Sequence, residues 1–292
     1  EQCSNLKVIS RGGVGVDSVD LDAATELGIC ICNTPGINTT EVADHAMALL
    51  LSLTRKIREQ DSLVKKGYWS DRTELVHPYR SELGRIAGNT VGIVGLGNIG
   101  KSFATRIKGF GPAKIIAYDP YIDRTTADLF GVELVELNEL LKTSDFISLH
   151  APSTEETHHI INEEAFSKMK NNCILINCAR GPLVDPSALF NALKNNIIPA
   201  AGIDVTEKEP ISSEDPLLSL DNLIITPHTA GSSAVSREVG TRKQAENVIK
   251  ILKGEAPHGL ANPEVIKTIA LMKTKANNRW SNVDLFDTSL KV

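Results

Sequence analysis

Three side chains in the second half of the chain have the types needed for acid–base chemistry on a small carboxylic acid: Arg180, Glu209 and His228. An arginine offers a planar, permanently charged fork that fits a carboxylate and a neighbouring carbonyl oxygen. A histidine gives or takes a proton near neutral pH, and a glutamate beside it stabilises the protonated ring. The set suits reduction of a 2-oxo acid, with the arginine on the acid and the histidine as proton donor.

Each of the three also has an ordinary structural interpretation. Arg180 could form a surface ion pair at a helix start, His228 could bond to loop backbone, and Glu209 could be a solvated turn residue. Their positions favour the joint interpretation, because each follows an apolar run typical of a buried strand. The carboxyl ends of parallel strands meet at one edge of a sheet, where ligands gather.

A glycine motif predicts the partner for this chemistry. Gly95, Gly97 and Gly100 follow an apolar run at 90–94 and open a stretch with helical periodicity. In a Gly-x-Gly-x-x-Gly turn, the first glycine allows the tight turn, the second admits a pyrophosphate, and the third lets the helix pack on its strand. Although the motif alone is weak, its place between a strand and a helix predicts a dinucleotide site.

Asp119 predicts which dinucleotide binds. It closes the next apolar run, roughly 20 residues beyond the last glycine, which is the spacing of the acid that bonds to the adenosine ribose hydroxyls. A carboxylate there repels a 2′-phosphate, so NAD is expected in preference to NADP. The alternative is a solvated turn acid before Pro120.

Composition limits the classes of protein to consider. The chain has 292 residues, enough for two domains, and its 41% hydrophobic and 23% charged residues are typical of a globular protein. A net charge of −5 without a basic block argues against nucleic acid or an anionic membrane as the main partner. No apolar run approaches the roughly 18 residues of a membrane span.

The cysteines and histidines give two further expectations. Five cysteines without a Cys-x-x-Cys pair are typical of a reduced, cytoplasmic protein. His158 and His159 stand beside two glutamates, but adjacent histidines are expected to point apart and no thiolate cluster supports them. No metal site is therefore predicted.

Alternating strand and helix patterns predict an α/β fold. Near-continuous apolar strands separated by helices indicate a doubly wound parallel sheet covered on both faces, with a boundary in the irregular stretch at 68–89. Residues 6–38 are too few to close a core alone, so missing upstream units, the C-terminal stretch or both are expected to complete it. The expected strands are 6–10, 29–32, 91–94, 114–118, 146–149, 173–177, 200–203 and 223–226, and the expected helices are 21–27, 40–66, 137–141, 163–169, 186–194, 233–253 and 262–280.

These motifs, in this order, resemble the D-isomer-specific 2-hydroxyacid dehydrogenase family. The resemblance covers about residues 6–262. It rests on Gly12-Gly13-Val14-Gly15-Val16-Asp17, Asn33-Thr34-Pro35-Gly36, the glycine motif, Tyr118-Asp119-Pro120, Leu149-His150-Ala151-Pro152, Asn177-Cys178-Ala179-Arg180-Gly181, Leu183-Val184-Asp185, Asp204-Val205 through Glu209-Pro210, and Thr226-Pro227-His228.

The resemblance implies a Rossmann-type NAD-binding domain at 71–231. It also implies a discontinuous, flavodoxin-like catalytic domain from 1–70 and 232–292, which lacks N-terminal units in this sequence. Arg180, Glu209 and His228 would be the catalytic set, with Val14, Gly15 and Arg180 at the substrate. The implied cofactor contacts are Val14, Gly95, Gly97, Asn98, Ile99, Gly100, Asp119, Ala151, Cys178, Ala179, Arg180, Asp204, His228 and Gly231.

One departure from the family pattern supplies a second hypothesis. The family usually has Val-Ala-Glu where this chain has Val42-Ala43-Asp44-His45, a sequence similar to the C-terminal-binding-protein-like subgroup. That subgroup includes corepressors, so an NAD-sensing interaction protein with little turnover is the alternative. The resemblance also implies a homodimer, with the segment around Trp69 and Tyr79 as a contact. It leaves open which 2-hydroxy acid is used and in which direction.

Overall fold

The computed structural model describes residues 3–275 and 278–283, which form two compact units. The larger unit is Thr39–Gly231, and the smaller unit combines Glu1–Asn38 with Ser232–Val292. The smaller unit is therefore discontinuous in sequence. No helix of the described residues is both long enough and apolar enough to cross a membrane.

A seven-stranded sheet, parallel throughout, forms the centre of the larger unit. The order is β5-β4-β3-β6-β7-β8-β9, so the chain winds outward from β3 in one direction and then from β6 in the other. This confirms the doubly wound, Rossmann-type sheet and places the switch in winding direction between β3 and β6. The strands are β3 (Thr90–Val94), β4 (Lys114–Tyr118), β5 (Glu133–Leu134), β6 (Phe146–Leu149), β7 (Ile174–Asn177), β8 (Ala200–Ile203) and β9 (Leu223–Ile225).

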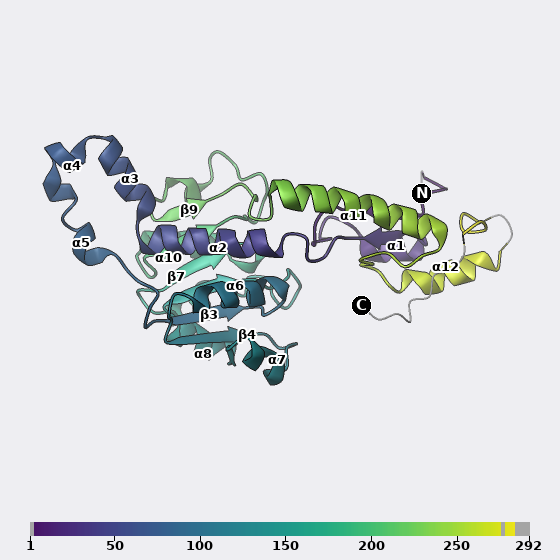
Figure 1. Ribbon diagram of the computed structural model, residues 1–292, viewed down its shortest axis with the longest axis horizontal. Coiled ribbons are helices and arrows are strands. Elements are labelled where there is room, and N and C mark those ends of the chain that lie inside the picture. Colours follow the sequence, from purple (N-terminus) through teal and green to yellow (C-terminus); the bar gives the residue numbers. More distant parts are fainter. Residues whose placement is uncertain (1–2, 276–277, 284–292) are drawn as a thin grey trace. The chain divides into compact units, whose positions relative to one another are not determined.

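Helices cover both faces of this sheet (Figure 1). The strands are apolar on both sides: in β6, Phe146 packs in one core while Ile147 and Leu149 pack in the other. Since successive side chains of a strand point to opposite faces, a strand buried on both sides lacks the regular alternation of apolar and polar residues seen in a half-exposed strand. One core includes α2 (Thr39–Thr54), α6 (Asn98–Lys108) and α7 (Arg124–Leu129), and the other includes α8 (Leu137–Thr143), α9 (Glu163–Lys168) and α10 (Pro186–Lys194).

The prediction of one long helix at 40–66 is wrong. Helix α2 ends at Thr54, and α3 (Ile57–Lys65) begins after Lys56, whose φ of 49° lies in the left-handed region. The Thr54 hydroxyl donates to the Leu50 carbonyl at 2.7 Å, and the Thr54 carbonyl accepts from Gly84 N at 3.0 Å. The Gly84 N–H therefore fixes the C-terminal end of α2. It occupies a carbonyl that would accept a hydrogen bond within the helix if the helix continued.

The segment after the break extends away from the sheet (Figure 1). It contains short helices where the sequence predicts an irregular stretch. The side chains of Ile57, Val64 and Trp69 are exposed along it. Its elements are α3, α4 (Tyr68–Asp71), η1 (Thr73–Leu75) and α5 (Tyr79–Glu82).

The smaller unit packs helices around a two-stranded parallel sheet, and its C-terminal part completes the core of its N-terminal part. Trp280, 1% exposed, donates from Nε1 to the Gly28 carbonyl at 2.9 Å. The Asn262 side chain accepts from Ile31 N at 2.8 Å and donates to the Ile29 carbonyl at 3.0 Å. The elements are β1 (Val8–Ser10), α1 (Leu21–Glu26), β2 (Cys30–Cys32), α11 (Ala234–Lys253) and α12 (Val265–Lys273).

The last helix is shorter than the predicted 262–280. Asn262 lies before α12, where its side chain bonds to the backbone of Ile29 and Ile31. The helix ends at Lys273. Residues 276–277 and 284–292 lie outside the described residues. The sequence also gave no indication of β5, which has only two residues.

The compact units divide the chain at different places from the predicted 1–70, 71–231 and 232–292. Helix α2 groups with the larger unit because it packs on α6, β7 and β8. The second division, between Gly231 and Ser232, coincides with the predicted one. The assignment of 1–70 and 232–292 to a substrate-binding domain stays a prediction.

Candidate active site

The glycine loop joins β3 to α6 beside the switch point of the sheet. Gly95 has φ of +90°, and a Cβ there would lie 2.5 Å from Ala151 N, at the end of β6. A Cβ at Gly100 would lie 2.2 Å from the Gly95 carbonyl oxygen. A Cβ at Gly97 would meet no described atom within 4 Å. The loop is thus closely packed at the first and third glycines and open at the second, which fits the approach of a pyrophosphate.

Asp119 is tied to this loop. One carboxylate oxygen accepts from Leu96 N at 2.7 Å, and the other accepts from Tyr121 N at 2.9 Å. The residue is more than a solvated turn acid, because it holds the glycine loop against the end of β4. Since each carboxylate oxygen has two lone pairs, Asp119 can still accept from ribose hydroxyls.

Asp204 organises the turn after β9 from the end of β8. Its side chain, 1% exposed, accepts from Thr226 Oγ1 at 2.5 Å, Thr229 N at 3.0 Å and Ala230 N at 2.8 Å. Its backbone carbonyl accepts from His228 N at 2.8 Å. A buried carboxylate needs such donors to offset its lost hydration. Asp204 therefore fixes the turn in which His228 has a φ of 53°.

His228 and Glu209 form the expected pair. Nδ1 of His228 lies 2.6 Å from Oε2 of Glu209, within a strong hydrogen bond. The other glutamate oxygen accepts from Thr206 N at 3.1 Å, so the carboxylate is held from both sides. The two side chains are 51% and 37% exposed, which leaves the ring accessible to a ligand.

Arg180 lies in the loop after β7, beside the loop that carries Glu209. A Cβ at Gly181 would lie 1.9 Å from the Thr206 carbonyl oxygen, so only glycine permits this approach. Asn177, 1% exposed, donates from Nδ2 to the Arg180 carbonyl at 2.9 Å. The arginine itself donates from Nη1 to the Ala179 carbonyl at 2.7 Å. The structure thus couples the arginine loop to the glutamate–histidine pair.

The remaining predicted cofactor residues in the larger unit follow the ends of its strands. Ala151 follows β6, Cys178 and Ala179 follow β7, and all three are buried. Burial raises the pKa of the Cys178 thiol, with the Asp204 carboxylate acting in the same direction, so the thiol is neutral. Asn98 and Ile99 form the first turn of α6, and Gly231 is the last residue of the unit.

Val14 and Gly15 belong to the smaller unit, in the loop after β1. The Val14 carbonyl accepts from Asn33 Nδ2 at 2.7 Å, and the Gly15 carbonyl accepts from the Arg11 guanidinium. Gly13, with φ of +120°, exchanges backbone and hydroxyl hydrogen bonds with Thr34. The loop between β1 and α1 is therefore held by the residues that follow β2.

Sequence reasoning missed the residues that support the histidine turn. Nε2 of His45, in α2, lies 2.9 Å from Thr226 Oγ1 and 3.7 Å from Asp204 Oδ1. The Asp44-His45 departure was visible, but its partner lies 181 residues away. Asn177 was visible only as part of a motif.

His150, just after β6, is a half-buried histidine near the switch point. Its Nε2 lies 2.9 Å from Ser148 Oγ, and its ring lies 5.1 Å from the Phe103 ring, centroid to centroid. Burial lowers the pKa of His150 to about 3, so the imidazole is neutral at physiological pH. It acts as a packed, uncharged ring between β6 and α6.

The expectation that His158 and His159 point apart is wrong. Their ring centroids lie 4.0 Å apart, and the donor atoms of both rings and of Glu207 lie within 4.8 Å of one another. The reason is local: both histidines lie in a turn, in which His159 has a left-handed φ of 49°, so their side chains do not alternate as they would in a strand.

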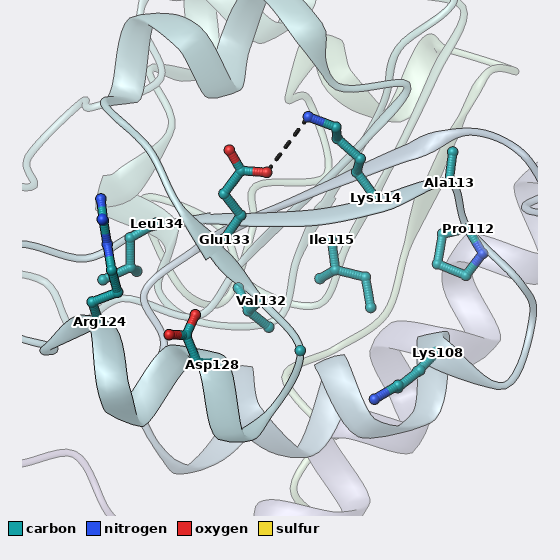
Figure 2. Close-up of a pocket in the computed structure, with 11 residues that line it drawn as sticks. Lys108, Pro112, Ala113, Lys114, Ile115, Arg124, Asp128, Val132, Glu133 and Leu134 are labelled. Carbon is teal, nitrogen blue, oxygen red and sulfur yellow. Dashed lines mark hydrogen bonds and ion pairs between the residues drawn. The ribbon is translucent and has the colours of Figure 1, made fainter.

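A hollow of about 630 Å³ lies at the opposite edge of the sheet (Figure 2). It lies beside Lys114 and Glu133, the first residues of β4 and β5, whose charged atoms are 3.5 Å apart. Ligands of open parallel sheets bind at the carboxyl ends of the strands. This hollow, at the amino ends, contains none of the predicted site residues.

Comparisons with known proteins agree with this geometry. Residues 47–230 match the family described as D-isomer specific 2-hydroxyacid dehydrogenase, NAD binding domain. A glyoxylate reductase of Korarchaeum cryptofilum is 43% identical over 267 residues, which cover 91% of this chain and 79% of that protein. A D-3-phosphoglycerate dehydrogenase of Methanocaldococcus jannaschii is 43% identical over 276 residues, 94% of this chain and 51% of that protein.

A solved structure has a similar fold. The holo form of D-mandelate dehydrogenase from Rhodotorula graminis superposes with a TM-score of 0.82 at 32% identity, covering 88% of this chain and 75% of that one. Sequence, fold and site geometry together show that the chain belongs to the D-isomer-specific 2-hydroxyacid dehydrogenase family, NAD-dependent oxidoreductases that act on the CH–OH group of 2-hydroxy acids.

Proposed function

We propose that His228, Glu209 and Arg180 carry out the proton transfer and substrate binding of this oxidoreductase. The observation that supports it most is the 2.6 Å contact between Glu209 Oε2 and His228 Nδ1. The contact orients the ring and leaves Nε2 for the substrate oxygen. When protonated, the ring can donate from Nε2 to the oxygen of a 2-oxo acid.

Arg180 is the proposed substrate anchor. Its guanidinium is charged at all relevant pH values and can bond to a carboxylate through two parallel N–H groups. The Gly181–Thr206 approach fixes its loop relative to the histidine pair. We propose that the backbone of Val14 and Gly15 also contacts the substrate carboxylate, as the family resemblance implies.

The glycine loop and Asp119 are the proposed NAD contacts, with the backbone around Gly97 at the pyrophosphate and Asp119 at the ribose. When bound, NADH supplies the hydride. Because Asp119 would repel a 2′-phosphate, we expect a higher kcat/KM for NADH than for NADPH. Asp119→Ser should narrow this difference, and an unchanged ratio would show that other residues set it.

The substrate class is proposed from the relatives. The Korarchaeum cryptofilum protein is named as a glyoxylate reductase, so glyoxylate is the first 2-oxo acid to test. The decisive assay follows NADH oxidation with glyoxylate, hydroxypyruvate, pyruvate and branched 2-oxo acids. Turnover with at least one of them is expected, and NADH binding without any turnover would instead favour the NAD-sensing alternative.

We further propose a homodimer formed through the segment that extends from the larger unit. Trp69 is 65% exposed there, and Ile57 and Val64 are exposed on the neighbouring helix. Exposed apolar side chains gathered on one segment are typical of an interface. Sedimentation analysis should give a dimer that Trp69→Ser weakens, whereas a monomer at all concentrations would exclude it. A cytoplasmic location, favoured by the unpaired cysteines, stays a prediction.

A further inference from the structure

We propose that His158, His159 and Glu207 form a binding site for a divalent transition-metal ion of the zinc type. Each residue offers one ligand atom, and the three atoms lie within 4.8 Å of one another. Two imidazole nitrogens and one carboxylate oxygen form a ligand set that zinc uses in proteins, with the fourth position left to water. This site is separate from the catalytic pair.

The separation of the two best-placed ligand atoms matches a tetrahedral ion. Nε2 of His159 lies 3.3 Å from Oε2 of Glu207. Two ligands at about 2.0–2.1 Å from zinc and at the tetrahedral angle are about 3.3 Å apart. An ion can therefore enter between these atoms without moving them apart. The exposed His158 ring has its ligand atom within 4.8 Å of both, so it is the third ligand of the same ion.

The backbone that carries the histidines is fixed before any ion binds. His159 N donates to the Pro182 carbonyl at 2.8 Å, and His158 N donates to the Thr154 carbonyl at 2.9 Å. The left-handed conformation of His159 places the two rings 4.0 Å apart, centroid to centroid. Two imidazole rings this close together can bind the same cation.

The backbone that carries the glutamate is fixed against the same turn. Gly181, next to Pro182, packs against the Thr206 carbonyl so closely that no side chain would fit. Both loops of the site are thus attached to the turn that follows Arg180. A bound ion would join the histidine loop to the loop that carries Glu209, and would stabilise the arrangement of the catalytic edge.

The test measures zinc bound per chain by equilibrium dialysis, using the whole chain in a Cys3→Ser background that removes the exposed thiol. One ion per chain is expected. His159→Ala and Glu207→Gln should each weaken binding by at least about 10–100-fold, the loss seen even for outer-sphere partners of a metal. Circular dichroism and NADH binding show that each variant is folded.

Two matched variants decide whether the ion is at this site. His258 pairs with Glu246 at 2.7 Å but has no second histidine, so His258→Ala should bind zinc normally. His228→Gln should also retain the ion. Loss of zinc in His228→Gln would place the ion at the catalytic pair and overturn the proposal. Unchanged binding in His159→Ala would also overturn it, as would the absence of zinc binding in the Cys3→Ser protein without further substitutions.

Discussion

The two edges of the seven-stranded sheet differ in what holds their charged side chains. At the amino edge, the hollow of Figure 2 is lined by charged residues joined by one exposed ion pair, Lys114 with Glu133 at 3.5 Å. At the carboxyl edge, Asp204 alone accepts three hydrogen bonds of 3.0 Å or less. The volume of a hollow therefore does not identify the edge that carries the proposed site. Polar groups that are held by several hydrogen bonds identify it.

The largest expected effect comes from His228→Gln at the carboxyl edge. Glutamine keeps the polarity and approximate size of the side chain but cannot transfer a proton near neutral pH. We expect kcat to fall by roughly 10²–10⁴-fold, the usual contribution of a general acid. Tryptophan-to-NADH energy transfer should show that the cofactor still binds. Near-normal turnover would remove the proton-transfer role from this residue.

Glu209→Gln tests the partner of the histidine. The amide keeps a hydrogen-bond acceptor but removes the carboxylate charge that lies 2.6 Å from the imidazole, so activity should fall by about 10–100-fold near neutral pH. An unchanged kcat in the 2-oxo acid assay would show that Glu209 only fills space.

Gly181→Ala tests whether the arginine loop is coupled to the glutamate loop. The added Cβ would lie 1.9 Å from the Thr206 carbonyl oxygen, so the loops must separate. A destabilisation of about 1–3 kcal/mol, typical of overpacking, is expected in urea unfolding, together with a raised KM for the 2-oxo acid.

Gly97→Ala is the matched control for that variant. Its Cβ would meet no described atom within 4 Å, and Gly97 does not have a positive φ. The stability of the cofactor-free protein should therefore stay within about 0.5 kcal/mol, while NADH binding weakens. Equal destabilisation by both substitutions would argue against the coupling of the two loops.

The strands, the glycine loop and the contact between Glu209 and His228 could be predicted from the sequence because their signals are local. Buried parallel strands are continuous apolar runs, and the glycines and Asp119 stand at fixed distances in one βαβ unit. The trio of Arg180, Glu209 and His228 also follows from position, since each comes after a strand.

What the sequence did not reveal depends on distant partners or on single backbone angles. The helix break at Lys56 follows residues with ordinary helix propensity, and its partners Gly84 and Glu82 lie almost 30 residues away. The contact of His45 with Thr226 joins α2 to the turn after β9. The close, tilted rings of His158 and His159 depend on the left-handed angle of His159, which no side-chain pattern encodes.

A smaller effect is expected from His150, whose neutral ring lies at the carboxyl edge. Its pKa is lowered to about 3 in the folded protein, from the ordinary value of 6.5 in the unfolded chain. Above pH 6.5 the imidazole is neutral in both the folded and the unfolded state. As pH falls below 6.5, only the unfolded chain takes up the proton, so stability is lost as pH falls toward about 3. His150→Asn should reduce the stability lost between about pH 7 and pH 4.5, measured by urea unfolding. An equal acid-induced loss in both proteins would mean that the ring is protonated in the fold.

The smallest effect is expected at the amino edge, from Lys114→Gln. The lysine and its partner Glu133 are 63% and 59% exposed, and such surface pairs contribute about 0–1 kcal/mol. We expect stability to change by less than about 0.5 kcal/mol and kcat and the KM for NADH to stay unchanged. The described residues that line the hollow are charged in part but are not held by several hydrogen bonds, as Asp204 is. Removing the charge of Lys114 should therefore not disturb the reaction. A clear rise in the KM for NADH would instead mean that the amino edge takes part in binding, and would remove the distinction between the two edges.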